Sequence, residues 1–515
     1  MTRHLKSTGA LVMWSFLATS PALAQFVAPP PPNPSAAIPP ASGRNGQGGN
    51  VTATEQPVAG TTTSVNTLNP TLQVSGPYTG SAPSTAAVPF SGKLTLAEAL
   101  RRGLSYNLGA VGSMQSARQS SAQERAVLST LLPNVSAALS ETVEQVDLAA
   151  LGFRITTPFP GVRIPSVVGP FNYFNLQGNF SQNLVNLTAF NNYRSARAIA
   201  RAGQYNQEDA RDLVTLAVGG AYLQVLAAQA RVDAAQVQLD TANAVFSQSS
   251  EQHAQGVLGR LNVDQNQVRS LTQQQQLITL RNDLAKQKIR LARLVGLPPN
   301  PNFDLTDKFP FTPAPVVTVD QAVAAAFETR ADLKAAIAQV EAARRALSAA
   351  RSERLPSLGV SGDYQVIGPN PASSHGAFNV TGTLNIPIWQ GGKTGSDIAQ
   401  AQAVLAQRQA ELADTRGQIE AEVREVYLDL EAAAGQVEVA RKNVDIAQET
   451  LEMTRARMQA GVVNTLEVIQ AQQTLSTAQL DLINSIFAHN LAKLNLARAL
   501  GHAPEQVNSL LKPAQ

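Results

Sequence analysis

The chain has 515 residues, of which only 15% are charged, compared with about 25% in an average soluble domain. Its formal net charge is only +3 and lysine and arginine are not clustered, so the charge pattern excludes a nucleic-acid-binding face. Cysteine is absent, which excludes disulfides, thiolate metal sites, a catalytic thiol and an N-terminal lipidated cysteine. The five histidines are scattered singly, so we expect neither a metal site nor a cofactor.

The N-terminus has the pattern of an export signal over residues 1–24. Arg3 and Lys6 precede an apolar run of about ten residues, which is shorter than the roughly twenty that a membrane helix needs. Ala22-Leu23-Ala24 then supplies a small-x-small cleavage pattern, so we expect the mature chain to begin at Gln25, with a retained anchor as the alternative. Residues 25–92 are rich in Pro, Gly, Ser and Thr and are expected to form a disordered leader, either a plain linker or a tether to peptidoglycan or a partner.

The rest of the chain contains two copies of one sequence repeat. Residues 94–100 resemble 317–323 in their apolar spacing, and the stretch Leu291–Gly296 recurs as Leu496–Gly501. Self-similarity at this scale predicts two copies of one supersecondary unit. We assign the first structural repeat to residues 93–305, the second to 315–505 and a tail to 506–515.

Each repeat contains a long segment in which apolar residues recur at every seventh position. In the second repeat, one row consists of large side chains: Val423, Leu430, Val437, Val444, Leu451 and Met458. The other row is mostly alanine: Ile419, Val426, Ala433, Ala440 and Ala447. A strict seven-residue repeat imposes left-handed supercoiling, and the alanine row lets helices approach closely. The first repeat carries the same two rows. We therefore predict long helices over about 189–253 and 395–458, each near 100 Å at about 1.5 Å per residue. Return helices over 262–294 and 465–500 make each an antiparallel hairpin, and shorter helices begin near 94 and 317.

Two pairs of strands are predicted between the helices. Apolar residues alternate with uncharged polar ones over 135–139, 174–181, 358–366 and 378–388. This is the pattern of membrane barrel strands, apolar towards lipid and polar towards the lumen, although a half-buried soluble sheet has the same period. Phe171, Tyr173 and Trp389 stand at segment ends and are predicted to be membrane-interface aromatics. Four strands cannot close a barrel, and an open edge cannot lie in lipid, so we expect three chains to share one twelve-stranded barrel.

Over about residues 92–503 the duplicated unit resembles the TolC-like outer membrane factors. Residues 460–472 are similar to the family's helical-hairpin tip, and residues 385–392 to its exit from strand to helix. The resemblance implies a mainly α fold with membrane β, in which a long α-helical barrel is joined to a shared 12-stranded trimeric β-barrel with four strands per chain. It also implies a homotrimer that works with a periplasmic adaptor (membrane fusion) protein and an inner-membrane transporter.

The same resemblance implies a periplasmic tip or gate at Gly256, Asn262, Gly461, Glu467 and Gln470. Glu467 matches an acidic ring at the constriction, whereas Asn262 and Gln470 stand where the best-known member has aspartates. Met458 and Val463 replace that member's tip tyrosine and arginine, so its latch is not reproduced. A reduced acidic ring predicts a weaker cation preference, unless Glu467 is simply a solvated acid in the first turn of a helix.

Three functions are compared with these features. The first is the passive exit duct of a tripartite efflux pump or type I secretion system, gated at its helical tips. The second, a periplasmic coiled-coil adaptor or scaffold, leaves the strands without a purpose, and the third, an enzyme on a barrel, lacks a nucleophile-base-acid arrangement. Gly392-Lys393-Thr394 resembles the end of a phosphate-binding loop, but Pro387 occupies the required first glycine position. We expect a channel in the bacterial outer membrane, in contact with its lipid and extending into the periplasm, that is not an enzyme, binds no nucleic acid and is not lipid-anchored.

Overall fold

The computed structural model describes residues 50–59, 66–82, 90, 92–152, 165–300, 302–308, 312–313, 318–460, 462 and 465–511. The predicted signal peptide, residues 1–24, lies outside these ranges. The described chain forms two units. One is a strand unit, residues 133–184 and 358–384, and the other is a helical unit built from the described residues outside those two ranges.

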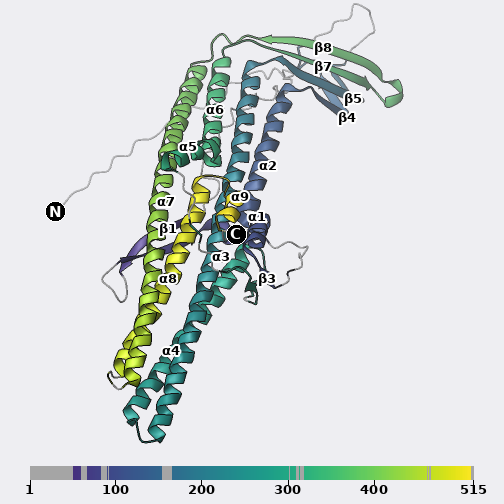
Figure 1. Ribbon diagram of the computed structural model, residues 1–515. Helices are drawn as coiled ribbons and strands as arrows, with labels where there is room; N and C mark the ends of the chain where they lie inside the picture. The colour runs from purple at the N-terminus through teal and green to yellow at the C-terminus, as the bar shows by residue number, and fades with distance from the viewer. Residues whose placement is uncertain are drawn as a thin grey trace, which may run out of the picture. The chain divides into compact units, whose positions relative to one another are not determined.

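The strand unit is one four-stranded sheet (Figure 1). Its strands are β4 (Asn134–Asp147), β5 (Val167–Val185), β7 (Ser357–Gly368) and β8 (His375–Asn385), in the spatial order β4-β5-β7-β8. The four predicted strands are confirmed, but β8 ends before Ile386 and Ile388, which were expected to belong to it. Pro387 lacks the amide hydrogen that would continue a ladder, which explains the earlier end. β5 begins at Val167, ahead of the predicted strand segment 174–181.

The helical unit contains two long hairpins. α3 (Leu187–Ala254) returns as α4 (Arg260–Leu294), and α7 (Lys393–Gln459) returns as α8 (Thr465–Ala499). The shorter helices are α1 (Leu96–Tyr106), α2 (Leu108–Leu128), α5 (Val319–Thr329), α6 (Ala331–Ser352) and α9 (Ala503–Leu511). Each hairpin packs on itself, and α3 of the first repeat also packs against α6 and α8 of the second (Figure 1). The predicted duplication is therefore visible as two similar hairpins joined side by side.

Side-chain caps explain where several of these helices begin. The Thr95 hydroxyl accepts a hydrogen bond from the Glu98 amide at 3.2 Å at the start of α1. The Asn186 side chain accepts one from the Ala189 amide at 2.9 Å at the start of α3. Each cap satisfies an amide that has no partner inside the first turn.

The predicted seven-residue rows form the buried seams of α3 and α7. Val214, Val218 and Val225 are fully buried in α3, as are Val423 and Ala433 in α7. His253 stands at the next position of the large row in the first repeat but is exposed, because α3 ends one residue later. Among the described helices only α3 contains a window apolar enough to cross a membrane, and 78% of that window is buried inside the protein. The apolar content of α3 is thus accounted for by core packing.

The expectation of a disordered leader over 25–92 is wrong for part of that segment. β1 (Val51–Ala59) and β2 (Asn66–Val74) form an antiparallel hairpin, followed by the 3-10 turn η1 (Gly76–Thr79). Val51, Leu72 and Val74 join the main apolar core, and the Ala53 carbonyl accepts a hydrogen bond from Asn495 Nδ2 at 3.3 Å. A few apolar residues on one face of the hairpin are therefore enough to order it, because α3 and α8 bury them from the other side.

The expected start of the C-terminal tail also differs from the structure. The tail was expected to start at residue 506, but α9 spans Ala503–Leu511 and buries Val507. β3 (Lys93–Leu94) and β6 (Asp304–Leu305) pair in parallel, so the two ends of the first repeat lie together. These short pairings depend on tertiary contacts and leave no periodic signal in the sequence.

Two equivalent glycines end the return helices. Gly296 follows α4 with φ 72°, and Gly501 follows α8 with φ 75°. The Leu297 amide donates to the Ala292 carbonyl at 2.9 Å, which closes the end of α4 in a Schellman motif. A Cβ on Gly296 would lie 2.7 Å from Tyr106 Cβ, whereas one on Gly501 would lie 3.1 Å from Thr329 Oγ1. Both positions require a left-handed backbone, and the first also requires the absence of a side chain.

We expect Gly296→Ala to destabilise the helical unit by about 1–3 kcal/mol, since it combines a disfavoured backbone with overpacking. Gly501→Ala should cost less, because its contact is looser. The measurement is denaturant unfolding of the detergent-solubilised protein, followed by helical circular dichroism. Gly435→Ala is the matched control, because Gly435 lies inside α7 with no atom within 4 Å of its missing Cβ, and it should be neutral or stabilising. Equal losses for Gly296→Ala and Gly435→Ala would contradict the steric argument.

Candidate functional site

The tip of the first hairpin is a tight turn at Gly256. This glycine has φ 75° and nothing within 4 Å of its missing Cβ, so the backbone conformation rather than crowding requires glycine. The Val257 amide donates to the Gln252 carbonyl at 2.9 Å, and His253 Nδ1 lies 2.7 Å from the Leu258 carbonyl. Val257 is 74% exposed at the end of the turn. The predicted tip is thus a true chain reversal with an apolar, exposed apex.

Asn262 lies in the first turn of α4, beside this reversal. It is half-buried, and its backbone amide donates to the Gly259 carbonyl at 3.1 Å. The neighbouring Leu261 side chain is 70% exposed. Asn262 therefore belongs to the tip, as the sequence predicted, and its role in gating stays a prediction.

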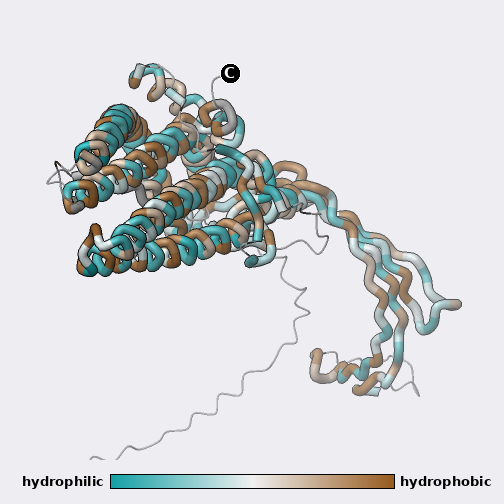
Figure 2. The backbone as a smooth tube through the Cα atoms, turned by 60° about the horizontal axis from the view of Figure 1, so that its bottom comes forward, coloured by the Kyte–Doolittle hydropathy of each residue, from teal (hydrophilic) through white to brown (hydrophobic). Residues whose placement is uncertain are grey.

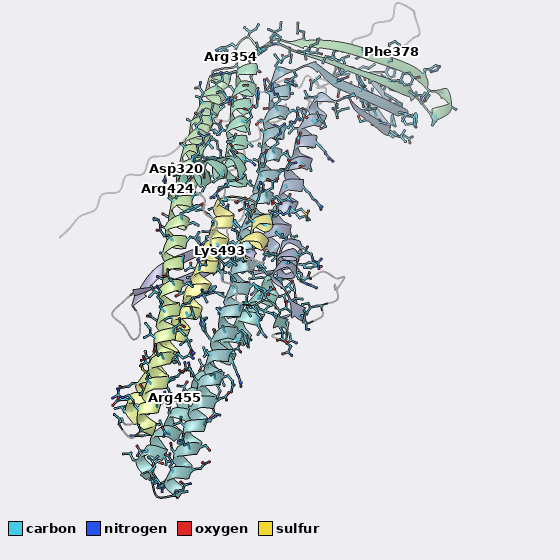
Figure 3. All side chains as sticks on the ribbon, viewed as in Figure 1. Asp320, Arg354, Phe378, Arg424, Arg455 and Lys493 are labelled. Carbon is cyan, nitrogen blue, oxygen red and sulfur yellow. The ribbon has the colours of Figure 1, made fainter. Side chains whose placement is uncertain are left out.

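The second tip joins α7 to α8. The Ala460 amide donates to the Ala456 carbonyl and the Val462 amide to the Arg457 carbonyl, both at 3.0 Å. Gly461, predicted to form this turn, lies outside the described residues. Arg455 marks the end of α7 close to this tip (Figure 3).

The polar residues predicted for the second tip lie in the first turns of α8. Glu467 and Gln470 are exposed, while Val468 between them is buried against Leu451 of α7. Their side chains therefore point away from the interior of their own hairpin. The structure places Gly256 and Asn262 at one tip and Glu467 and Gln470 at the other.

Sequence reasoning missed two arginines that connect the hairpins. Arg231 Nη2 in α3 donates to Asn484 Oδ1 in α8 at 2.7 Å, and Arg269 Nη2 in α4 donates to the Ile469 carbonyl in α8 at 3.4 Å. Burial lowers the pKa of both guanidinium groups, and for Arg231 the charge of Asp283 opposes that shift. The only signal in the sequence was a single arginine between two uncharged residues, which is also what a solvated helix face looks like.

The sheet has one apolar and one polar face. In the register of β4 and β5, Val135 lies opposite Phe180 and Leu139 opposite Leu176, whereas Ser136 lies opposite Asn179. Figure 2 shows the same alternation of hydrophobic and hydrophilic residues along the strands. The apolar face is exposed: Val135 is 78%, Leu139 67% and Phe378 78% accessible. An exposed apolar face of this extent is unfavourable in water and favourable in lipid.

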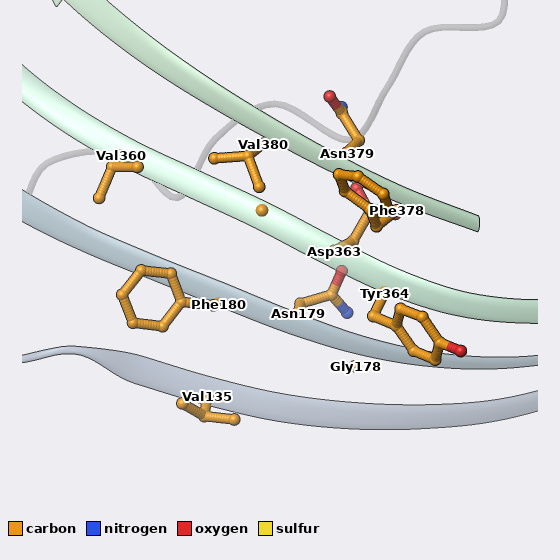
Figure 4. Close-up of a pocket in the computed structure, with 11 residues that line it drawn as sticks. Val135, Gly178, Asn179, Phe180, Val360, Asp363, Tyr364, Phe378, Asn379 and Val380 are labelled. Atoms are coloured by element: carbon orange, nitrogen blue, oxygen red, sulfur yellow. The ribbon is translucent and has the colours of Figure 1, made fainter. Parts of the chain in front are cut away.

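The apolar face also contains a shallow hollow of about 530 Å³. It lies where Gly178 of β5 and Gly362 of β7 lack side chains, and Phe180, Tyr364 and Phe378 surround it (Figure 4). The hollow is part of the apolar face, and we assign it no separate role.

The strand register corrects the prediction for two of the interface aromatics. Phe171 lies opposite Glu144 and Tyr173 opposite Thr142, with their ring centroids 6.5 Å apart. Because side chains alternate along β5, both rings share the face of Asn175 and Asn179, not that of Leu176 and Phe180. The polar face would line a lumen, so neither residue fits a lipid-facing girdle. Their position near the strand end suggested the girdle. The face on which a side chain lies is decided instead by whether its position along β5 is odd or even, and both residues share the parity of Asn175.

Trp389, the third predicted interface aromatic, lies beyond the end of β8. Its side chain is 87% exposed, and the neighbouring Ile388 is 95% exposed. Burial of these two side chains by something outside this chain would be strongly favourable. A membrane-interface role for Trp389 stays a prediction.

These features define a class of protein, one that combines a sheet with an exposed apolar face and two helical hairpins whose longer helices are about 100 Å long. Residues 113–297 and 322–502 match the model of the outer membrane efflux protein family. This match covers more than half of the chain, and the chain therefore belongs to that family. Membership places it in the outer membrane.

Among curated proteins the chain is similar to the pyoverdine export outer membrane protein OpmQ of Pseudomonas aeruginosa. The two are 28% identical over 318 residues, which cover 60% of this chain and 65% of OpmQ. The matched part thus spans somewhat less than two thirds of this relative.

Solved structures show the same fold. VceC from Vibrio cholerae is 20% identical with a TM-score of 0.66, and the match covers 79% of this chain and 96% of VceC. The MtrE channel of Neisseria gonorrhoeae, solved in its open state, is 14% identical with a TM-score of 0.66, covering 88% of this chain and 98% of MtrE. The expected fold class, long helices plus a membrane sheet, is confirmed. MtrE is described as an outer membrane channel, and OpmQ and VceC as outer membrane proteins. As a member of the outer membrane efflux protein family the chain is not an enzyme, as expected.

Proposed function

We propose that the chain is a passive exit duct in the outer membrane, serving a tripartite efflux pump or a type I secretion system. The observation that carries this proposal is the combination, in one chain, of an exposed apolar sheet face with two helical hairpins whose longer helices, α3 and α7, each extend about 100 Å. No substrate chemistry is needed in such a duct, because cargo moves through it when the tips open. The cargo of OpmQ is named as pyoverdine; for this chain we assign no particular cargo.

The proposed working form is a homotrimer. The two outer strands of the sheet, β4 and β8, each have a partner on one side only. A membrane sheet needs every backbone group paired, so edges must be covered by strands of other chains. Three copies in cyclic symmetry would give twelve strands and an open lumen. A periplasmic adaptor and an inner-membrane transporter are the further partners that we propose, with the adaptor binding at the tips.

The mass of the detergent-extracted particle tests this proposal first. Light scattering corrected for bound detergent should give three chains per particle, and the purified particle should conduct ions across a planar bilayer. A soluble monomer or dimer in the periplasmic fraction would instead favour the coiled-coil adaptor, which the exposed apolar sheet argues against.

We propose the gate at the hairpin tips, with Gly256 and Gly461 at the turns and Asn262, Glu467 and Gln470 lining the constriction. Glu467 is exposed in the first turn of α8, where three copies would form a ring of carboxylates. Such a ring favours cations in a narrow pore. Glu467→Ala should therefore lower the cation-to-anion permeability ratio, measured as a reversal potential in a salt gradient. Glu438→Ala, which removes an exposed carboxylate from α7 far from the tip, is the control. If Glu467→Ala left the reversal potential unchanged, Glu467 would be an ordinary solvated acid.

A further inference from the structure

The apolar core of the helical unit divides into two as the hairpins approach their tips. The main cluster joins the hairpins, because Val218 and Leu226 of α3 share it with Phe487 and Leu491 of α8. Nearer the tips, one cluster contains Val232, Ala235 and Leu277 of the first hairpin, and another contains Leu451, Val468 and Ala471 of the second. Each of these two clusters lies within a single hairpin. Among the described residues near the tips, the buried apolar clusters therefore hold each hairpin together, and neither of them joins one hairpin to the other.

Polar contacts between the hairpins weaken in the same direction. Arg498 of α8 binds Asp209 of α3 at 2.5 Å, beside the shared core. Arg231 donates to Asn484 at 2.7 Å where the shared core ends. Arg269 donates to the Ile469 carbonyl at 3.4 Å near the tips, a long bond to an acceptor that already serves its own helix.

The surroundings of the Arg269 bond are poorly satisfied. Within about one helical turn of Arg269 or Ile469, Asn266 Oδ1, Gln273 Oε1 and Gln472 Nε2 are buried without a hydrogen-bond partner among the described residues. A buried polar atom without a partner is unfavourable, and it would regain a hydrogen bond if it became accessible to water. Wherever such an atom becomes accessible to water when the hairpins separate, the free-energy cost of separating them is lowered.

We propose that Arg269 is a gating residue: its bond to the Ile469 carbonyl holds the two tips together in the closed channel, and when this bond breaks the hairpins part, starting at the tips and ending at the shared core. The inference rests on the proposed duct function and names the contact that must break in it. Ile469 lies between Glu467 and Gln470 on α8, so separation of the hairpins at Arg269 moves the proposed constriction directly. The shared core around Val218 acts as the fixed end of this motion.

Single-channel recording tests the role of Arg269. We expect Arg269→Ala to raise the ratio of open to closed channels about tenfold, which corresponds to about 1.4 kcal/mol. Arg269→Lys keeps a charged donor, so its ratio of open to closed channels should lie between those of the wild-type protein and Arg269→Ala. The matched control is Arg281→Ala, because Arg281 also belongs to α4 but donates to Gln236 Oε1 at 2.8 Å within its own hairpin. Arg281→Ala should leave the ratio at its wild-type value.

A distance measurement separates this proposal from the duct proposal. The chain has no cysteine, so cysteines introduced at the exposed Leu261 and Leu466 can carry spin labels on the two tips. In trimers with one labelled chain, Arg269→Ala should lengthen and broaden the label distance, and Arg281→Ala should not. Unchanged distances and unchanged gating in a conducting channel would overturn the role of Arg269, as would an equal effect of Arg281→Ala. A wild-type trimer that fails to conduct would refute the duct, while the label distances would still decide whether Arg269 ties the tips.

Discussion

Replacing Leu139 with arginine is expected to prevent stable insertion of the protein into the outer membrane. Leu139 lies on the apolar face of β4, opposite Leu176, and is 67% exposed. An arginine on the lipid face of a barrel costs about 2–4 kcal/mol near the bilayer midplane. A trimer would carry this cost three times, roughly 6–12 kcal/mol in total. The measurement is the amount of heat-modifiable trimer recovered from purified outer membranes.

Ser140→Arg is the matched control for this substitution. Ser140 is the next residue of the same strand and lies opposite Asn175 on the polar face. An arginine there should face the lumen, so trimer yield should stay near the wild-type level while ion selectivity shifts towards anions. Equal recovery of the two variants would mean that the apolar face does not contact lipid.

The second large effect is expected for Arg498→Ala, which should destabilise the helical unit by about 3–5 kcal/mol. Arg498 is buried, and its Nη2 lies 2.5 Å from Asp209 Oδ1 and 4.0 Å from Asp332 Oδ2. Arg330 completes the network, with Nη2 at 2.8 Å from Asp332 Oδ2 and Nη1 at 2.6 Å from Glu422 Oε2. Removing Arg498 would leave buried carboxylates with too little positive charge. Denaturant unfolding at neutral pH measures the loss, and Lys442→Ala, which breaks an exposed pair, should cause none.

The pH dependence of Arg498→Ala gives a second readout. Burial alone would raise the pKa of Asp332, but the hydrogen bond and charge of Arg330, aided by Arg498, hold it below its usual value. Burial raises the pKa of Asp212 to about 6, and the charge of Arg498 limits that rise. Without Arg498 both pKa values should move upwards, so both groups would take up protons more readily in the folded variant than in the folded wild-type protein. The difference in free energy of unfolding between the wild-type protein and the variant should then shrink as the pH falls from 7 towards 4. A deficit independent of pH would indicate lost packing instead of lost charge.

The hairpins could be predicted from the sequence because their signal is local and repeated. Rows of apolar residues at every seventh position mark the buried seam of a long helix, and Val218 and Val423 occupy that seam as expected. The glycines at 296 and 501 mark helix ends for an equally local reason, since a left-handed residue is needed there. Alternation along β4 and β5 likewise predicted strands with one apolar face.

Other features depend on which segments meet. The β1–β2 hairpin has little apolar content of its own, and it is ordered by burial of Val51 and Leu72 against helices far away in the sequence. Position along the strand suggested a girdle for Phe171 and Tyr173, whereas the pairing with β4 places both on the polar face. Of the predicted gate, Gly256, Asn262, Glu467 and Gln470 lie at the tips, but Arg269 was not predicted.

The sequence by itself determined the duplication, the two long hairpins and the two-faced strands, because periodicity is a property of neighbouring residues. Only the tertiary structure decided how the two repeats are joined. Asp209 and Arg498 form an ion pair although they are 289 residues apart, and Arg269 reaches Ile469 from one hairpin to the other. Such contacts exist only once two helix faces have been brought together, and an arginine that will be buried in this way carries the same local pattern as one that faces water.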